Sequence, residues 1–169
     1  CVAMFKAVKN EQSDFLFQQT NGNEIFFLAW TTTPWTLPSN LGLTVWPNID
    51  YVLVSTFNPY THLPVNVVLA KALVGKYFKA DGENGDFAGY SAETKLLPWK
   101  VLTEFKGKDI EGVYYEQLLP YEANSKEAVL AITPDADPFK VIVGDFVTTE
   151  DGTGIVHTAP AFGADDYRV

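Results

Sequence analysis

The segment 31–40, TTTPWTLPSN, places four threonines, two prolines and an asparagine directly after an apolar run. Proline lacks the N–H that a sheet ladder needs, so the preceding strand must end here. Hydroxyl groups on a proline-stiffened loop form hydrogen bonds with little reorganisation, which suits the orientation of a polar ligand and a water molecule. The alternative is a turn whose hydroxyls satisfy only the local backbone, and spacing alone favours that alternative.

A second polar segment, 150–167, reads EDGTGIVHTAPAFGADDY. Its Asp-Gly pair indicates a tight turn, and the Thr-Gly pair that follows allows the backbone to re-enter a sheet at close approach. His157 then lies near the end of a strand, and a helix after it would return Asp165 and Asp166 towards that end. A lone strand histidine is more often packed than catalytic, and paired acids at a helix start are usually caps. His62 is interpreted as a surface residue.

Other catalytic classes fit the sequence poorly. A zinc hydrolase needs three or four ligands at workable spacing, whereas His62 and His157 lie 95 positions apart and Cys1 is the only cysteine. No phosphate-binding glycine-rich loop and no Gly-x-Ser-x-Gly motif occurs. The sequence therefore predicts chemistry without a metal or a cofactor, or simple binding.

Length and composition favour a single globular domain. A chain of 169 residues with 47% hydrophobic residues can bury a sizeable core. Its longest apolar stretches, 25–30 and 65–70, are far shorter than the ~20 residues of a membrane span. The cysteine usage favours the cytoplasm. The chain begins without methionine and ends at Val169 in an unfinished polar pattern, so it is interpreted as a piece excised from a larger protein. The isolated piece is expected to be monomeric.

The net charge of −9, with a single arginine, argues against independent tight binding to a phosphate backbone. Any nucleic acid must then be delivered by another part of the protein. Lys95, Lys100, Lys106 and Lys108 form the one basic cluster in the sequence. It is either a phosphate contact or a solvated face, and the second is favoured.

Short runs rich in β-branched and aromatic residues between Gly, Pro, Asn and Asp clusters predict a β-dominated α+β domain. The predicted strands are Phe15–Gln18, Glu24–Trp30, Gly42–Trp46, Tyr51–Phe57, Asn66–Leu69, Gly112–Leu118, Val141–Thr148 and Gly154–Thr158. Helical patterns are scarce. They are a short amphipathic run at Lys71–Phe78 and a helix start at Ala164–Val169, and Tyr115–Leu119 could be helical instead of part of a strand. Lys79–Gly89 is predicted to be a surface loop.

Taken together, TTTPWTLPxN and GTGxVHTAP followed by an Asp-Asp pair resemble the editing domain inserted in isoleucyl-tRNA synthetases, and the match spans essentially the whole chain. The leucyl and valyl relatives usually carry arginine at the position of Thr33 and an acidic residue at that of Trp35, and the valyl relative lacks a histidine at position 157. The resemblance implies a distorted β-barrel core with short peripheral helices, and residues 1–169 as one editing domain of a larger synthetase.

The activity that the resemblance implies is hydrolysis of the ester that joins valine to the terminal adenosine of isoleucine tRNA. In this reading Asp166 binds the α-ammonium group, a charge-assisted contact. His157 excludes the extra methylene of isoleucine by its bulk. The threonine loop positions the adenosine and the attacking water. Trp35 either lines the adenosine pocket or packs, and Asp165 is a cap. The implied site residues are Thr31, Thr32, Thr33, Thr36 and Asp166 for catalysis, and His157, Asp166, Trp35, Asn40 and Thr158 for substrate binding.

Two alternatives stay open. A valyl-type domain would clear threonine, with His157 as a polar partner for its hydroxyl. A catalytically silent module would bind the end of the tRNA without a productive water. In every case the implied partners are the 3′-terminal adenosine of a charged tRNA and the rest of the synthetase, with no cofactor, metal or membrane. The chain carries neither His-x-Gly-His nor Lys-Met-Ser-Lys-Ser, so it should not charge tRNA by itself.

Overall fold

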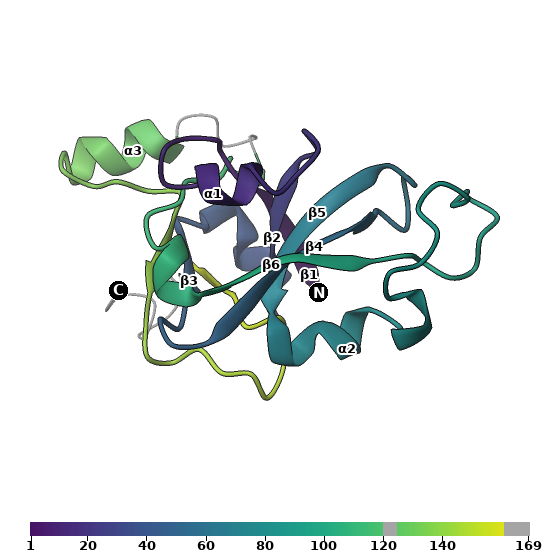
Figure 1. The fold of residues 1–169 in the computed structure, drawn as a ribbon. Coiled ribbons are helices and arrows are strands. Elements are labelled where there is room, and N and C mark those ends of the chain that lie inside the picture. Colours follow the sequence, from purple (N-terminus) through teal and green to yellow (C-terminus); the bar gives the residue numbers. More distant parts are fainter. Residues whose placement is uncertain (120–124, 161–169) are drawn as a thin grey trace.

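The computed structural model describes residues 1–119 and 125–160, which are built mainly from β-strands. Over these residues the chain forms one mixed sheet, in which β2 pairs antiparallel with β1 and parallel with both β5 and β8. The rest of the order is β6-β4-β5-β2-β8-β3-β7 (Figure 1). The strands are β1 Val2–Lys6, β2 Ile25–Trp30, β3 Gly42–Val45, β4 Asp50–Phe57, β5 Pro64–Ala70, β6 Lys100–Lys106, β7 Lys140–Val143 and β8 Val156–Thr158.

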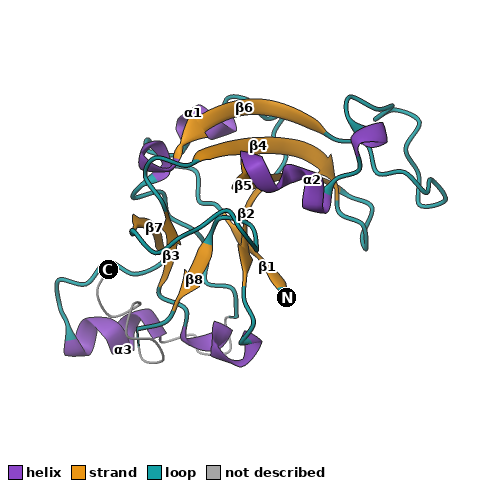
Figure 2. Cartoon of the chain, turned by 90° about the horizontal axis from the view of Figure 1, so that it is seen from below, coloured by secondary structure: helices purple, strands orange, loops and turns teal. Residues whose placement is uncertain are grey.

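The sheet curls into a half-barrel with short helices at its edges. Figure 2 shows β4 and β6 as long neighbours on one side and β3, β7 and β8 on another, with α3 at the periphery. Among the described residues no helix is long and apolar enough to cross a membrane. The α-helices are α1 Asp14–Phe17, α2 Val74–Tyr77 and α3 Ser125–Ile132, and the 3-10 helices are η1 Pro34–Ser39, η2 Lys71–Leu73, η3 Ala80–Gly82 and η4 Gly107–Ile110.

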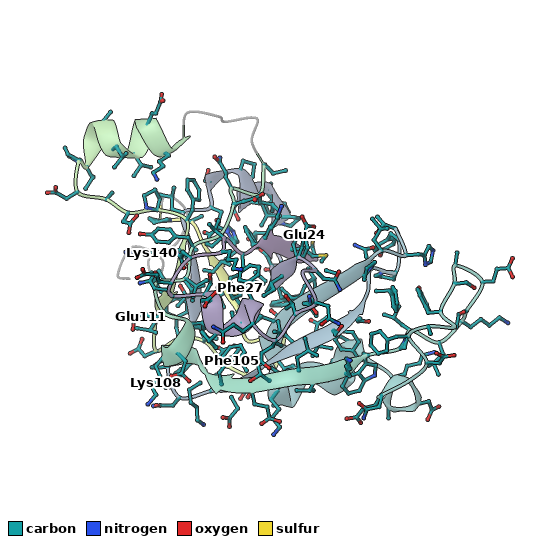
Figure 3. All side chains as sticks on the ribbon, turned by 45° about the horizontal axis from the view of Figure 1, so that its top comes forward. Glu24, Phe27, Phe105, Lys108, Glu111 and Lys140 are labelled. Carbon is teal, nitrogen blue, oxygen red and sulfur yellow. The ribbon has the colours of Figure 1, made fainter. Side chains whose placement is uncertain are left out.

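Strand β2 is buried on both faces, which explains its continuous apolar sequence IFFLAW. Ile25 and Phe27 enter the main core inside the curl, where Phe105 of β6 also lies (Figure 3). Leu28 faces a second apolar cluster on the opposite side, which α2 partly covers. The two clusters on either side of one strand hold the end of β2 at Trp30 in a defined place.

The predicted fold class is confirmed, and so are most of the predicted strands. The segments predicted for β2, β3, β4 and β5 all form strands, while β7 and β8 occupy only parts of the segments 141–148 and 154–158. The predicted helical run 71–78 appears as η2 followed by α2. The predicted loop 79–89 contains η3 and is anchored by a bridge between Glu83 and Trp99.

The strand predicted at Phe15–Gln18 is wrong, because this segment lies in and next to α1. Ser13 and Asn10 exchange backbone and side-chain hydrogen bonds just before it, and the N–H of Leu16 donates to the Ser13 carbonyl at 2.9 Å. These local bonds favour a helical turn over an extended chain. A run of four residues is too short for periodicity to distinguish the two.

The strand predicted at Gly112–Leu118 is also wrong, and so is its helical alternative at Tyr115–Leu119. Tyr114 and Tyr115 make only isolated bridges, to Lys140 and Ala7. Gly112 has a positive φ of 78°, which turns the chain into this passage and prevents a regular strand. The sequence prediction missed β1 and β6, both with only one strand partner in the described sheet, and α3.

Two buried tyrosine hydroxyls tie distant segments together. Tyr51 donates to the Gly154 carbonyl at 2.6 Å, and Tyr115 donates to Asn40 Oδ1 at 2.5 Å. Burial raises the pKa of both hydroxyls, that of Tyr115 well above its usual range. Both side chains therefore remain hydrogen-bond donors at any ordinary pH.

We expect these tyrosines to make the fold sensitive to alkali. Below about pH 10, the ordinary pKa of a tyrosine hydroxyl, the folded and the unfolded chain both keep these protons. Above it the unfolded chain loses them first, because its pKa is the lower one, so folding stability falls by about 1.4 kcal/mol per pH unit for each tyrosine. Urea unfolding between pH 9 and pH 11 should show this slope, reduced in Tyr51→Phe and in Tyr115→Phe. Tyr60→Phe, at a side chain that is 90% exposed, is the control. An equal slope in all the variants would contradict the prediction.

Candidate functional site

The threonine loop begins where the sequence predicts that the sheet must stop. Strand β2 ends at Trp30, and η1 starts at Pro34, with Pro38 inside it. Backbone bonds of 2.9 and 3.0 Å between Cys1 and Thr31 fix the start of the loop. The loop is therefore held at its start by the edge of the sheet and further along by a short proline-containing helix.

The turn before β8 brings a second segment to this loop. Gly152 and Gly154 both have positive φ, 72° and 76°, which glycine adopts without strain. A Cβ at Gly154 would lie 2.4 Å from the Cβ of Ala70, so the backbone enters the sheet at the close approach that the sequence predicts. Pairing of β8 with β3 sets His157 opposite Leu43, with its ring beside η1.

The two segments enclose a pocket of about 430 Å³. Thr31, Thr36 and His157 contribute buried side chains, whereas Thr32 and Thr33 are exposed. The volume lies within the usual range for small-molecule sites. The described residues that line it are Trp30, Thr31, Thr32, Thr33, Trp35, Thr36, Val156, His157 and Ala159.

Hydrogen bonds on both ring nitrogens hold His157. Its Nε2 lies 2.8 Å from Thr36 Oγ1, and its Nδ1 lies 3.2 Å from Asn40 Nδ2. An amide nitrogen only donates, so Nδ1 accepts and the ring proton is on Nε2. Thr36 Oγ1 accepts a hydrogen bond from Nε2–H, and its own hydroxyl donates to the Thr33 carbonyl at 2.8 Å. These bonds describe a neutral imidazole fixed against the pocket.

The threonines satisfy the local backbone and line the pocket at the same time. Thr31 Oγ1 accepts from the N–H of Thr33 at 3.0 Å and lies 3.3 Å from Thr33 Oγ1. The turn that spacing alone favours is therefore present, and the same threonines line the pocket. The two readings of this loop are compatible.

The indole of Trp35 does not pack into the core, because the side chain is 73% exposed at the rim of the pocket. Trp30, which is 39% exposed, lines the pocket as well and was not predicted. A Cβ at Gly152 would lie 3.1 Å from the Trp30 side chain, so this glycine makes room for the ring. Position at the end of a buried strand was the only signal that could have identified Trp30.

Two predicted binding residues are outside the pocket lining. Asn40 is buried behind His157, and Thr158 turns away to bond Thr44, with 2.6 Å between their Oγ1 atoms. His62 lies at the β4–β5 turn, where its Nδ1 is 2.9 Å from the Tyr90 hydroxyl. The predicted ammonium ligand Asp166, its neighbour Asp165 and the predicted helix start at 164–169 lie outside the described residues.

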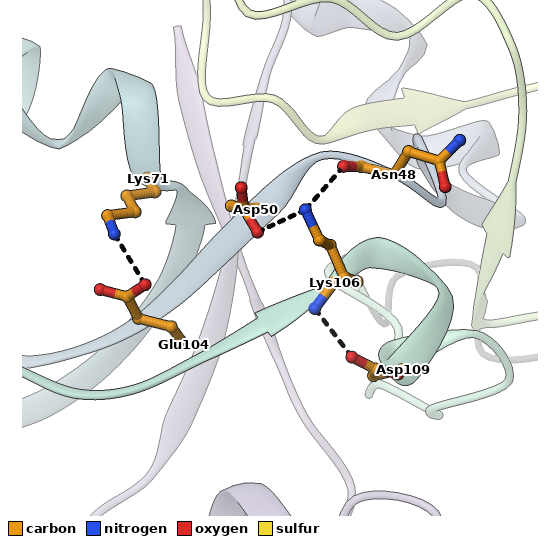
Figure 4. Close-up of polar contacts among 6 residues, drawn as sticks. All are labelled: Asn48, Asp50, Lys71, Glu104, Lys106 and Asp109. Carbon is orange, nitrogen blue, oxygen red and sulfur yellow. Dashed lines mark hydrogen bonds and ion pairs between the residues drawn. The ribbon is translucent and has the colours of Figure 1, made fainter.

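The lysines that cluster in the sequence do not form one patch. Lys100 and Lys106 lie at opposite ends of β6, and Lys106 Nζ binds Asp50 at 2.7 Å (Figure 4). Lys108 is exposed on η4 (Figure 3). A solvated face describes these side chains better than a phosphate site.

The described part of the pocket lining contains no Asp, Glu, Lys or Arg side chain. The side chains that line it in the described part of the chain are hydroxyls, indoles, small apolar groups and the neutral imidazole, none with a formal charge. Within residues 1–119 and 125–160, no group of three His, Cys, Asp or Glu side chains is placed to hold a metal ion. What this arrangement offers is a fixed set of hydroxyl and imidazole groups that can orient a ligand and a water.

The sequence relatives of the chain include isoleucine–tRNA ligases. The chain is 58% identical over 144 residues to an isoleucine–tRNA ligase of Cytophaga hutchinsonii, covering 85% of this chain and 12% of that protein. It is 51% identical over 170 residues to that of Porphyromonas gingivalis, covering 100% of this chain and 14% of that protein. The chain thus spans only about an eighth of the length of these relatives, as the 12% and 14% shares show. No family model matches the chain.

Solved structures share the fold at low sequence identity. The structure of GlLeuRS-CP1 superimposes with a TM-score of 0.67 at 17% identity, covering 99% of this chain and 57% of that one. The editing domain of the cytosolic leucyl-tRNA synthetase of P. knowlesi gives a TM-score of 0.62 at 12% identity, covering 98% of this chain and 60% of that one. These matches show that the half-barrel is a fold used by synthetase editing domains.

Proposed function

Since the chain belongs to the isoleucine–tRNA ligase family, as a segment with the fold of the inserted editing domain, we propose that it hydrolyses valine from wrongly charged isoleucine tRNA. The observation that carries the proposal is the pocket between the threonine loop and His157. We further propose that residues 1–169 form a single editing domain of a larger synthetase.

The need for such a site follows from the size of the substrates. Isoleucine exceeds valine by one methylene, which is worth only about 1–3 kcal/mol in a binding pocket; isoleucyl-tRNA synthetases are the usual example of this limit. A second site must therefore accept valine and refuse isoleucine. A rigid wall is suited to that task, since forcing an extra methylene into a packed space costs about 1–3 kcal/mol.

His157 supplies the wall in this proposal. Its ring is buried and bonded at both nitrogens, so it cannot swing aside without breaking the bonds to Thr36 and Asn40. Because Nδ1 is already an acceptor and Nε2 already a donor, the ring acts by bulk and position, and it is not assigned the role of a general base.

The threonine hydroxyls orient the attacking water and the ester. An aminoacyl ester is activated compared with an amide, so correct placement of water supplies much of the rate. Thr32 and Thr33 have exposed side chains that can reach a ligand, while Thr31 and Thr36 are held by bonds within the loop. The exposed indole of Trp35 is placed at the rim, where it offers a flat surface to the terminal adenine.

The test is release of the amino acid from mischarged tRNA by the full-length synthetase that carries this segment. Release of valine from isoleucine tRNA supports the proposal. Release of threonine, but not valine, would assign a valyl-type specificity, and no release would leave a silent binding module. Charging of tRNA with isoleucine by the same preparation is the control for an intact enzyme.

Asp166→Ala should lower the rate of valine release by roughly 10- to 100-fold, because a charge-assisted hydrogen bond to the α-ammonium is worth about 1.5–3 kcal/mol. This role is taken from the family resemblance. Single-turnover hydrolysis of valyl-tRNA measures the loss. The neighbouring Asp165→Ala is the matched control and should retain most of the rate. Equal losses in both variants would remove Asp166 as the specific ligand.

A further inference from the structure

Behind the pocket, a buried tyrosine ends the chain of hydrogen bonds that holds His157. The hydroxyl of Tyr115 donates to Asn40 Oδ1 at 2.5 Å, across 75 positions of sequence. Asn40 in turn contacts His157 Nδ1 at 3.2 Å. We propose that Tyr115 is a positioning residue that sets the discrimination of the pocket by fixing His157 through Asn40. This inference rests on the proposed editing function.

The ring of Tyr115 is itself held on both sides. Phe5 packs against it edge-on at a centroid distance of 5.3 Å, and Phe139 does so at 6.2 Å. The backbone N–H of Tyr115 also donates to the Phe139 carbonyl at 2.9 Å. Because the side chain is only 3% exposed, its hydroxyl cannot exchange Asn40 for bulk water. The ring therefore presents a fixed donor to the amide.

The orientation of Asn40 follows from its two fixed neighbours. The Gly42 carbonyl, 2.7 Å from Asn40 Nδ2, can only accept, so the amide nitrogen must face it. The amide oxygen then faces Tyr115, which donates. One hydrogen of Nδ2 is used by Gly42, and the second points to His157 Nδ1. The Gly42 carbonyl and the Tyr115 hydroxyl together fix the orientation of the Asn40 amide. The amide in turn determines which nitrogen of His157 carries the proton.

Loss of the phenol oxygen would unbalance this arrangement. Among residues 1–119 and 125–160 no buried side-chain nitrogen or oxygen lacks a hydrogen-bond partner, and Tyr115→Phe would leave Asn40 Oδ1 without its donor. Amide rotation then competes with the native orientation, and the ring of His157 loses its fixed position. Misplacement of a wall by a fraction of an ångström weakens exclusion of one methylene more than it weakens hydrolysis of valine.

The kinetic test compares Tyr115→Phe with wild type in the full-length synthetase. The ratio of the valyl-tRNA to the isoleucyl-tRNA hydrolysis rate should fall roughly tenfold in the variant, with most of the change in isoleucine hydrolysis. Thr56→Val is the control, because it removes a buried hydroxyl that bonds the Pro98 carbonyl, away from the pocket and from Asn40 and His157. Its ratio should stay at the wild-type value. An equal fall in both variants, or no fall in Tyr115→Phe, would overturn the proposal.

The second readout is the imidazole ¹⁵N spectrum of the chain, which contains only two histidines, so His62→Gln leaves the signals of His157 alone. In wild type the spectrum should show an unprotonated Nδ1 and a protonated Nε2. Tyr115→Phe should shift these signals or average them between tautomers, and Thr56→Val should not. Unchanged signals in Tyr115→Phe would refute the positioning role. If wild type releases no valine, the editing proposal fails, and the spectra alone then decide whether Tyr115 fixes His157.

Discussion

Replacing His157 by alanine is expected to make the synthetase hydrolyse correctly charged isoleucyl-tRNA. The imidazole lines the pocket, is 7% exposed and is bonded to Thr36 and Asn40, so its removal opens space that the neighbouring side chains cannot quickly fill. If the wall excludes isoleucine at a cost of about 1–3 kcal/mol, the rate on isoleucyl-tRNA should rise roughly 5- to 150-fold. Deacylation of isoleucyl-tRNA under single-turnover conditions measures the change.

Two further variants separate bulk from chemistry at this position. His157→Phe keeps the volume of the ring and removes both nitrogens, so it should continue to reject isoleucine if size alone matters. His62→Ala changes the other histidine, at the β4–β5 turn, and should behave like wild type. Continued rejection of isoleucine by His157→Ala would show that the wall lies elsewhere.

Gly154→Ala is expected to lower the free energy of unfolding by about 2–5 kcal/mol. A left-handed φ of 76° costs a residue with a Cβ about 1–2 kcal/mol. The new Cβ would lie 2.4 Å from the Cβ of Ala70, and relief of such an overlap costs about 1–3 kcal/mol more. Because β8 follows directly, its displacement should also shift His157 and slow valine release. Urea unfolding and the hydrolysis assay measure the two effects.

The chain offers a matched control for this glycine. Gly22 has a φ of 83° with no atom within 4 Å of its ideal Cβ, so Gly22→Ala should show the backbone cost alone. Adding Ala70→Gly to Gly154→Ala removes the overlap between the two Cβ atoms. The double variant should therefore recover the free energy of unfolding by which Gly154→Ala falls below Gly22→Ala. If Gly154→Ala costs no more than Gly22→Ala, the close approach to β5 is not what constrains this turn.

Sequence patterns predicted the central strands of the sheet. They failed at an outer strand and at a short helical turn. The run 25–30 is apolar at every position and became a strand buried on both faces. Strand β6 has mostly exposed or half-buried side chains, so it shows no clean alternation that a pattern could detect. At Phe15–Gln18 the bonds between Asn10 and Ser13 outweighed the β propensity of two phenylalanines.

The features of the candidate site also fall into those that the sequence predicted and those that required the structure. Local properties of proline, glycine and hydroxyl side chains were enough to predict that a threonine loop ends one strand, that glycines admit another, and that His157 lies near the end of that second strand. The tertiary structure is needed to place Asn40 behind His157, to turn Thr158 towards Thr44, and to bring the Tyr115 hydroxyl to Asn40. These contacts join residues 75 to 117 positions apart. The contacts of His157 and Thr158 depend on the register between β3 and β8, where a shift by a single residue would turn each side chain to the other face.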